Sequence, residues 1–404
     1  MLINNKRKWV ICTVAILIIT NILAFSIGNR VSLSLPNGNV EISKANLDEV
    51  LKFQKLFAVR DQLYKYYDGK IDDNALLNGA IKGMTNALND PYTVFMDANE
   101  TKSFNTQIQG QEYVGIGIQV ENRDNKVTVN AVFDGSPAEK AGIKAGDAIV
   151  KIDGTAIAGA DLNKAVSMMK GKENTNVTLT IARTGRDNFD VIAQRKKIAY
   201  NTVTGQMLSN NIGYIDISMF DENTGENFDK KLQELKAAGM KGLILDLRDN
   251  GGGVLDDCLK VASNFIDKGK TVVYTVDKNN KKQIYKSEGG STVGIPLVVL
   301  TNGNTASASE IFSGAIKDYK AGTLIGEKTF GKGVVQTTFN TGDNTQLKVT
   351  ISKWYTPLNE NINHNGFQPD IEVKYPQDLL NKPYDRNSDP QFQKALEVIN
   401  SKVK

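Results

Sequence analysis

The sequence predicts a multidomain α/β protein whose parts follow one another along the chain. Its 404 residues exceed the roughly 100–200 that one domain usually holds, so we expect two or three domains. A β-rich region precedes a longer region in which strands alternate with helices, an order typical of a largely parallel sheet. A helical region lies ahead of both, and an apolar segment lies near the start of the chain. The predicted order is therefore a transmembrane helix, a helical subdomain, a β-rich domain, an α/β core and a C-terminal helical tail.

The N-terminal residues 1–29 are predicted to form a cytoplasmic tail and a membrane anchor. No charged residue occurs in residues 10–29, and about 20 mostly apolar residues suffice to cross a bilayer once. Lys6, Arg7 and Lys8 precede this span, so the positive-inside rule keeps the tail cytoplasmic and exports the rest. We therefore expect a single-pass protein of the cell membrane with its domains on the extracytoplasmic side. The alternative is a signal peptide that is cleaved near residues 24–26.

Composition limits the functions open to this chain. The net charge of +4 is small for the length and spread along the sequence, so we expect no nucleic-acid partner. His364, the single histidine, and Cys258 have no neighbours at metal-ligand spacing, which predicts neither a metal nor a cofactor. Cys12 lies inside the apolar span, so the exported part has no intrachain disulfide and must be stable through packing.

Residues 30–44 are polar and predict a stalk, and residues 45–110 predict a helical N-terminal subdomain. Apolar residues recur at spacings of three and four in two runs that end at Asp90-Pro91. The first run is Leu56, Val59, Leu63, Tyr66 and Tyr67, and the second is Leu77, Ala80, Ile81, Met84 and Leu88. Two helices alone bury little surface, so this hairpin is either a packing subdomain or the contact of a homodimer.

Residues 111–198 predict a β-rich domain. Strands are expected at residues 113–120, 127–129 and 177–181, and the segment 135–154 between them resembles the central motif of a PDZ domain. The predicted peptide-binding residues are Tyr113, Val114, Gly115, Ile116, Gly117 and Ile118. The two glycines let backbone amides converge on a carboxylate, and a strand edge can add a peptide as a further strand. The alternative is that the glycines only form a tight turn into the strand; a dinucleotide-binding fingerprint is absent because its third glycine is missing.

Residues 199–376 predict the α/β core, and residues 377–404 a C-terminal helical tail. Strands are expected at residues 212–217, 242–247 and 296–300, and helices at 225–238, from 254 and at 306–319. Ligands of such sheets bind at the carboxyl ends of the strands. The loops at 249–253 and 301–305 both lie at that edge.

Ser307 is the candidate nucleophile, because it stands where a strand ends and a helix begins. Its hydroxyl would lie near the free amides of a helix N-terminus, which suits attack on a carbonyl. The stretch Ser307-Ala308-Ser309-Glu310 is also a capping box, and this structural explanation is strong on the motif alone. Ser309 is the competing choice of nucleophile.

With one histidine in the chain, lysine is the leading candidate for the base. Lys332, between two glycines, could act near neutral pH if its pKa fell by about 3 units. Gln336 could hold its amine without adding a charge. Gly252, Gly253 and the Ala308 amide are candidates for an oxyanion hole, since glycine allows close approach of the backbone. A solvated lysine, a strand glutamine and a helix-terminating turn are the structural alternatives.

These segments together resemble the carboxyl-terminal processing proteases, also called tail-specific proteases, over residues 45–376. The matching segments are residues 90–93, the PDZ-like motif, and residues 245–253, 307–311, 331–336 and 366–371. The resemblance implies Ser307 as nucleophile, Lys332 as base and Gln336 as its support. It also implies a core related to the ClpP and crotonase folds, with an inserted PDZ domain able to gate the site. Thr305 stands where a second serine is common.

We therefore expect a membrane-anchored serine endopeptidase that binds the carboxyl-terminal tails of exported proteins and cleaves them through an acyl-enzyme. One alternative is an inactive PDZ scaffold that holds such tails at the membrane. A crotonase-like acyl-transfer enzyme would need a coenzyme pocket, for which the sequence offers no signal. His364 could replace Lys332 as the base, although it lies in the polar loop 361–365.

Overall fold

The computed structural model describes residues 30–35, 38–110, 112–123, 125–133, 135–144, 146–183, 185–198, 202–379 and 384–403. They form two compact units, of which the first ends at Ala80 and the second begins at Ile81. None of the helices in these ranges is long and apolar enough to span a membrane. The span predicted at residues 10–29 lies outside the described residues.

The first unit begins with a β-hairpin in place of the predicted stalk. Strands β1 (Arg30–Leu35) and β2 (Gly38–Ser43) pair antiparallel, and α2 (Lys44–Lys52) and α3 (Gln54–Tyr66) follow. Valine, leucine and isoleucine alternate with polar residues in both strands, the period of a β-strand that the overall polarity of the segment obscured. The helix α4 (Asp73–Asn86) begins after Asp72, whose Oδ1 accepts hydrogen bonds from the amides of Asn74 and Ala75 at 2.9 and 3.1 Å.

The second unit starts with a short segment that joins the core sheet, a connection that the prediction of a purely helical subdomain missed. Strand β3 (Val94–Met96) pairs antiparallel with β20 (Thr345–Tyr355). The helix α5 (Ala98–Ile108) follows, and its N-cap Asp97 forms a reciprocal capping box with Glu100.

The β-rich domain has its own hydrophobic core and a sheet whose strand order is β10-β9-β7-β6-β5. Its elements are β4 (Tyr113–Gly115), β5 (Ile118–Arg123), β6 (Lys126–Val132), α6 (Pro137–Lys140), β7 (Ala148–Ile152), β8 (Thr155–Ala156), α7 (Leu162–Met169), β9 (Asn176–Ala182), β10 (Phe189–Gln194) and β11 (Lys196–Ile198). The strand predicted over 113–120 is interrupted at Gly117, whose φ is +79°; a Cβ there would lie 2.4 Å from the Ser136 Cβ. Strand β5 ends the sheet, and the described residues leave its outer edge unpaired.

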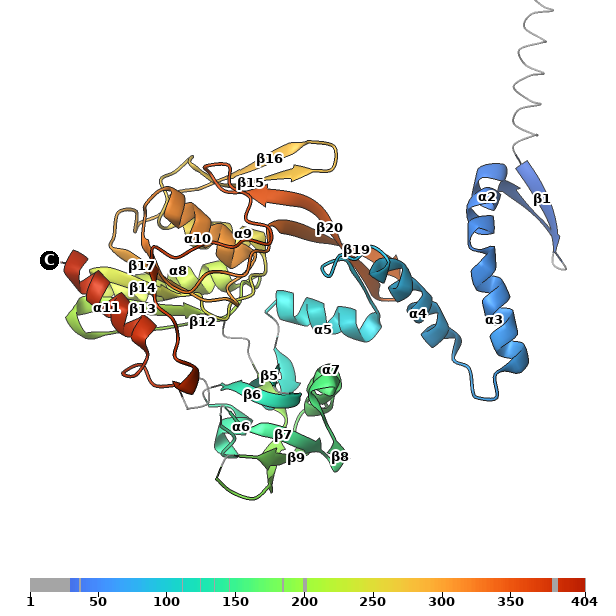
Figure 1. Cartoon of the computed structure of the whole chain (residues 1–404), viewed down its shortest axis with the longest axis horizontal. Helices are drawn as coiled ribbons and strands as arrows, with labels where there is room; N and C mark the ends of the chain where they lie inside the picture. Colours follow the sequence, from blue (N-terminus) through green and yellow to red (C-terminus); the bar gives the residue numbers. More distant parts are fainter. Residues whose placement is uncertain are drawn as a thin grey trace, which may run out of the picture. The chain divides into compact units, whose positions relative to one another are not determined.

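The α/β core is built on a six-stranded sheet in the order β12-β13-β14-β17-β18-β21 (Figure 1). These strands are β12 (Val203–Met207), β13 (Ile212–Ile217), β14 (Gly242–Asp246), β17 (Leu297–Thr301), β18 (Thr323–Gly326) and β21 (Ile371–Glu372). Only β12 runs antiparallel to its neighbour. Every residue of β14 and β17 is buried, as expected where helices cover both faces of a parallel sheet.

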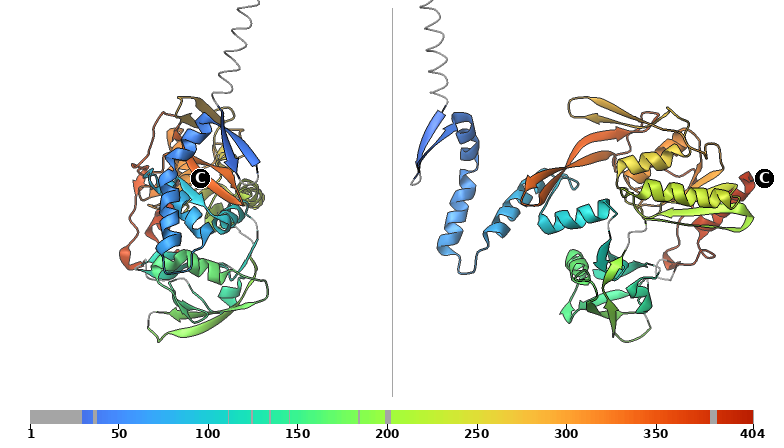
Figure 2. Two further views of the ribbon diagram at one scale, coloured as in Figure 1. Left: turned by 90° about the vertical axis from the view of Figure 1, so that its right-hand side faces the viewer. Right: turned by 180° about the vertical axis from the view of Figure 1, so that it is seen from behind.

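Helices α8 (Thr224–Ala237), α9 (Leu255–Ser263) and α10 (Ala308–Asp318) pack on one face of this sheet, and α11 (Pro390–Lys402) packs on the other (Figure 2). The predicted strands and helices of the core are confirmed to within about two residues at most ends. The C-terminal helix is part of the core and not a separate tail, because Phe392, Ala395 and Ile399 are buried against the sheet.

A second sheet has the order β16-β15-β20-β19, with β3 at the side of β20. It is formed by β15 (Thr271–Asp277), β16 (Lys282–Lys286), β19 (Val334–Gly342) and β20. The indole of Trp354, 1% exposed, donates a hydrogen bond to the Lys332 carbonyl at 2.8 Å. This bond fixes the chain just before β19.

Candidate active site

Ser307 lies between β17 and α10 in a backbone conformation that is rare for a residue with a side chain. Its φ is 56° and its ψ is −116°. The amides of Glu310 and Ile311 donate to the Ser307 carbonyl oxygen, both at 2.9 Å, whereas the Ser307 hydroxyl makes no cap hydrogen bond. A strained backbone at the start of a helix is typical of functional positions. The capping explanation therefore accounts for Glu310, whereas the Ser307 hydroxyl has no capping partner among the described residues.

Glu310 connects the two catalytic candidates through its buried carboxylate. Its Oε2 accepts hydrogen bonds from the amides of Ser307 at 2.9 Å and Lys332 at 2.8 Å. Its Oε1 accepts from the Gly331 amide at 2.7 Å and the Thr329 hydroxyl at 2.6 Å. Four donors occupy about all the lone-pair positions of a carboxylate. One fully buried side chain thus holds the backbone of Ser307 beside that of Lys332.

Lys332 is half-buried in the loop before β19, and its surroundings favour the neutral amine. Burial lowers the pKa of Lys332, the charge of Lys348 lowers it further, and Asp90 and Glu310 oppose this shift. Lys348 is on β20, and burial lowers its pKa as well. Nothing in the local sequence points to Lys348, because its charge acts on Lys332 only once β19 and β20 pair.

Gln336 lies on β19, where its Nε2 donates to Thr350 Oγ1 at 3.3 Å. Ser307, Lys332, Gln336 and Lys348 all line one cavity. Within the described residues no hydrogen bond joins the Ser307 hydroxyl, the Lys332 amine and the Gln336 amide to one another. In enzymes without substrate such bonds are often long and shorten in the complex.

The glycine loop after β14 lies directly against Ser307. A Cβ on Gly252, whose φ is +95°, would lie 2.8 Å from both the Ala308 nitrogen and the Ser307 Cβ. The Gly252 amide donates to Asn250 Oδ1 at 2.9 Å, so it is already occupied. The Phe220 amide donates a hydrogen bond to the Gly252 carbonyl, and the Val254 amide donates one to the Phe220 carbonyl. These two bonds lie on either side of Gly253, so the Gly253 amide points away from Phe220. The Ala308 amide begins a helix and has no intrahelical acceptor.

Asn250 is a residue whose part in the site the sequence did not reveal. Its side chain is fully buried, and the side-chain nitrogen donates to the Ile217 carbonyl at 2.6 Å. The backbone carbonyl of Asn250 accepts from the Ala306 amide at 3.0 Å. Together with the bond to Gly252, these contacts tie the glycine loop to β13 and to the residue before Ser307.

The two alternative residues have different surroundings. Ser309 is 0% exposed, and its hydroxyl has no hydrogen-bond partner in the described structure. His364 is exposed, and its backbone amide donates to the Gly331 carbonyl at 2.8 Å. Neither residue is among those that line the cavity.

The same cavity, of about 2060 Å³, extends along the β-rich domain. Of the predicted peptide-binding residues it is lined by Tyr113, Gly115, Ile116, Gly117 and Ile118, while Val114 does not line it. Helix α7 lies beside the open edge of β5 and contributes Val166 and Met169 to the lining, and Lys170 follows directly after the helix. Lys170 Nζ lies 5.2 Å from the centroid of the Tyr113 ring, and burial lowers its pKa. This lysine is a cation near the glycines that the sequence did not single out.

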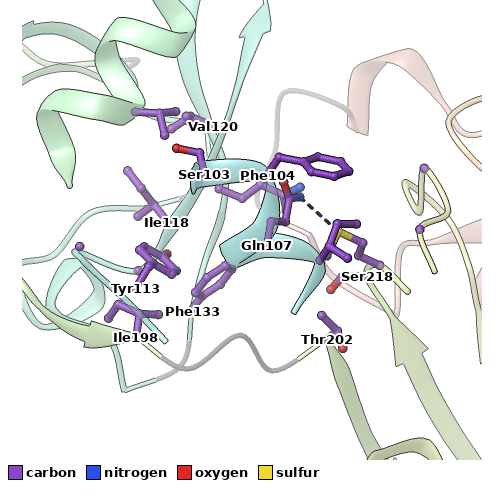
Figure 3. Close-up of a pocket in the computed structure, with 18 of the residues that line it drawn as sticks. Ser103, Phe104, Gln107, Tyr113, Ile118, Val120, Phe133, Ile198, Thr202 and Ser218 are labelled. Carbon is purple, nitrogen blue, oxygen red and sulfur yellow. Dashed lines mark hydrogen bonds between the residues drawn. The ribbon is translucent and has the colours of Figure 1, made fainter. Parts of the chain in front are cut away.

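Helix α5 supplies the part of the wall between the β-rich domain and the core. Figure 3 shows Ser103, Phe104 and Gln107 with Tyr113, Ile118, Val120, Phe133 and Ile198 of the β-rich domain and with Thr202 and Ser218. The Gln107 Nε2 donates to the Met219 sulfur at 3.1 Å, which fixes α5 to the core. The cavity is thus continuous from the edge of β5 to Ser307.

Three family models match the chain in the order of its parts. The description Activating protease CtpB N-terminal domain matches residues 26–101, PDZ domain matches 114–191, and Peptidase family S41 matches 211–373. The class defined by fold and site is therefore a serine peptidase that carries a PDZ domain.

Curated relatives and solved structures agree with this class. The carboxy-terminal processing protease CtpA of Bacillus subtilis is 41% identical over 333 residues, which cover 82% of this chain and 71% of that protein. A CtpA-like serine protease of Staphylococcus haemolyticus is 36% identical, over 93% of this chain and 75% of that protein. The photosystem II D1 C-terminal processing protease superposes with a TM-score of 0.55 at 31% identity, over 79% of this chain and 86% of that chain. The chain belongs to the carboxy-terminal processing proteases of peptidase family S41, and it is a serine hydrolase.

Proposed function

We propose that this protease cleaves peptide bonds by a Ser307–Lys332 dyad, after its PDZ domain has captured the carboxyl-terminal tail of an exported protein. The observation that carries this proposal is the Glu310 carboxylate, which accepts hydrogen bonds from the amides of both residues. The two side chains line one cavity, and their backbones share one acceptor. The ClpP and crotonase relationship of the core, which the resemblance implied, is part of the same proposal.

The reaction begins with the neutral amine of Lys332, which takes the proton of the Ser307 hydroxyl as Oγ attacks the scissile carbonyl. The amides of Gly253 and Ala308 stabilise the oxyanion, and Gly252 supplies the space beside Ser307. The Lys332 ammonium then protonates the leaving amine, and an acyl-enzyme forms on Ser307. Water then attacks this ester while the Lys332 amine takes its proton, and the Lys332 ammonium returns the proton to Ser307 Oγ as the acid product leaves. Gln336 supports the Lys332 amine when substrate is bound.

The PDZ domain binds the tail as an added strand on the free edge of β5, facing α7. The tail carboxylate accepts hydrogen bonds from amides of the segment 115–117, where Gly117 gives the backbone its positive φ. Lys170 adds a positive charge to this end of the groove. A tail held here can reach Ser307 within one cavity.

Substitution of Lys332 by alanine tests the dyad. We expect kcat on an unstructured protein to fall at least about a thousandfold, because the Ser307 hydroxyl loses its proton acceptor. The measurement follows new peptide termini by mass spectrometry, with a chelator present in all samples. His364→Ala is the matched comparison and should cleave at the wild-type rate, since His364 does not line the cavity.

The inactive scaffold is the competing outcome of that experiment. If the wild type binds tail peptides and produces no new termini, the protein is a scaffold. If Lys332→Ala cleaves at the wild-type rate, the dyad is wrong and another group is the base.

The division of the chain is also proposed: anchor at 1–29, stalk region at 30–44 with the hairpin described above, N-terminal subdomain at 45–110, PDZ domain at 111–198, protease core at 199–376 and C-terminal segment at 377–404.

The uncharged residues 10–29 after three basic residues support a retained, single-pass anchor with the catalytic domains outside. The intact mass of protein extracted from membranes tests the anchor. A mass that lacks the first 26 or so residues would show a cleaved signal peptide instead.

A homodimer through the N-terminal unit is proposed for its apolar surface. Helix α3 has no buried residue, and its Leu56, Phe57, Val59 and Tyr64 are 46–55% exposed. Exposed apolar surface of this kind is typical of interaction sites. Sedimentation of the solubilised protein should give twice the chain mass, and Leu56→Lys with Val59→Lys should give the monomer. A monomeric wild type would contradict the proposal.

A further inference from the structure

The turn Asp90-Pro91-Tyr92-Thr93 is one of the segments that resemble the family, and the proposed reaction does not use it. It nevertheless lies beside the Lys332 side chain. The Tyr92 ring centroid is 4.6 Å from Lys332 Nζ. Tyr92 is half-buried, and burial first, with the charges of Glu310 and Asp90, raises the pKa of its phenol, so the ring stays neutral. The amine therefore lies over the face of an uncharged aromatic ring.

Hydrogen bonds hold this turn rigidly in place. Asp90 Oδ1 accepts from the Tyr92 amide at 3.0 Å, and Asp90 Oδ2 accepts from the Thr93 hydroxyl at 2.6 Å. The Thr93 oxygen in turn accepts from the Thr350 amide on β20 at 3.0 Å. Thr350 is also the residue whose hydroxyl accepts from Gln336. The turn, Gln336 and Lys332 are thus fixed to one strand pair.

We propose that Tyr92 is a positioning residue for Lys332. The Tyr92 ring keeps water from the Lys332 amine and attracts the ammonium that forms on it during the reaction. A ring face attracts a cation, so the protonated amine has a partner without a counter-ion that would keep it permanently charged. The charged groups around the amine are Lys348 on β20, Asp90 in the turn and Glu310 on α10. The inference rests on the proposed role of Lys332 as the base.

The direction of the effect follows from the causes of the pKa shift. Burial is the largest cause that lowers the pKa of Lys332, and the Tyr92 ring lies beside the amine. Loss of the ring admits water, which raises the pKa, and removes the attraction of the ring for the ammonium, which lowers it. Because burial is the largest cause, we expect the net change to be a rise towards the ordinary value. Less neutral amine is then present at neutral pH, and the rise of kcat/KM with pH moves to more alkaline values.

The test compares pH profiles of kcat and KM on a fluorogenic peptide for the full-length, solubilised protein and its variants. We expect Tyr92→Leu to move the ascending limb of the pH profile by about one pH unit to more alkaline values. At neutral pH, kcat should be about tenfold lower than in the wild type, and KM should stay within about twofold of the wild-type value. Tyr92→Phe keeps the ring and should keep the limb at the wild-type pH. Tyr285→Leu, a change to another half-buried tyrosine, should leave the profile unmoved.

A second measurement does not need activity. The pH dependence of Lys332 reductive methylation, mapped by mass spectrometry in a Ser307→Ala background, reports the pKa of the amine directly, and Tyr92→Met replaces Tyr92→Leu if the latter melts early. The inference would be overturned if Tyr92→Leu and Tyr92→Met left both the ascending limb of the pH profile and the methylation profile at the wild-type pH. It would also be overturned if Tyr92→Phe shifted them as much as Tyr92→Leu. Full activity of Lys332→Ala would instead overturn the proposed function.

Discussion

Ser307→Ala is expected to abolish hydrolysis while tail binding to the PDZ domain is retained. Without the hydroxyl no acyl-enzyme forms, and removal of a serine nucleophile leaves at most a small residual rate, so we expect kcat to fall at least about a thousandfold. The PDZ groove lies on separate elements, so the dissociation constant of a tail peptide should stay within about twofold. Gel-based cleavage of an unfolded protein and fluorescence anisotropy of a labelled tail measure the two properties.

Ser309→Ala is the matched comparison for this variant. Ser309 is two residues along the same helix, fully buried, and its hydroxyl lacks a partner among the described residues. Its removal should leave kcat close to that of the wild type. Loss of activity in Ser309→Ala together with cleavage by Ser307→Ala would reverse the assignment of the nucleophile.

Glu310→Ala is expected to cost both stability and activity. The change leaves three backbone amides and the Thr329 hydroxyl without their acceptor, and each buried unpaired donor costs about 1–3 kcal/mol. We expect the free energy of unfolding to fall by at least about 3 kcal/mol. Since the Ser307 and Lys332 backbones lose their common anchor, kcat should fall about a hundredfold or more.

Glu310→Gln separates charge from geometry in the same position. The amide keeps one oxygen acceptor and presents an NH₂ group to donors, so it should lie between wild type and Glu310→Ala in both properties. Urea unfolding and kcat on a peptide measure them, with Glu327→Gln as a comparison at a half-buried glutamate whose side chain, among the described residues, accepts one hydrogen bond, from the Tyr375 amide. If Glu310→Ala were as stable and as active as Glu327→Gln, the anchoring role of Glu310 would be wrong.

Local patterns sufficed for three central strands of the core and their helices, whereas the candidate nucleophile and base came from motifs that resemble those of a known family. The periodicity of strands β13, β14 and β17 and of their helices is a property of short windows, and each prediction there is confirmed. Ser307, Lys332 and Gln336 were found by motif, and the structure brings all three to one cavity. Their catalytic roles remain predictions.

Features that depend on contacts distant in sequence could not be predicted. The bond from Thr350 to Thr93 joins residues 257 positions apart, and it brings Tyr92 to Lys332. Glu310 had a sufficient local explanation as a capping residue, which hid its bonds to Gly331 and Lys332. The Gly252 amide, which the sequence offers as an oxyanion donor, is bonded to the Asn250 side chain. In each case tertiary packing decides which polar group remains free.

The acyl-enzyme on Ser307, formed with Lys332 as the base, can be observed directly. The enzyme is quenched rapidly during turnover of a peptide ester, and its peptides are then mapped. We expect an adduct of the acyl mass on the peptide that contains Ser307, which forms in the wild type, forms far more slowly in Lys332→Ala, and is absent in Ser307→Ala. If the adduct were located at Ser309, or if full turnover left no covalent adduct, Ser307 would not be the nucleophile.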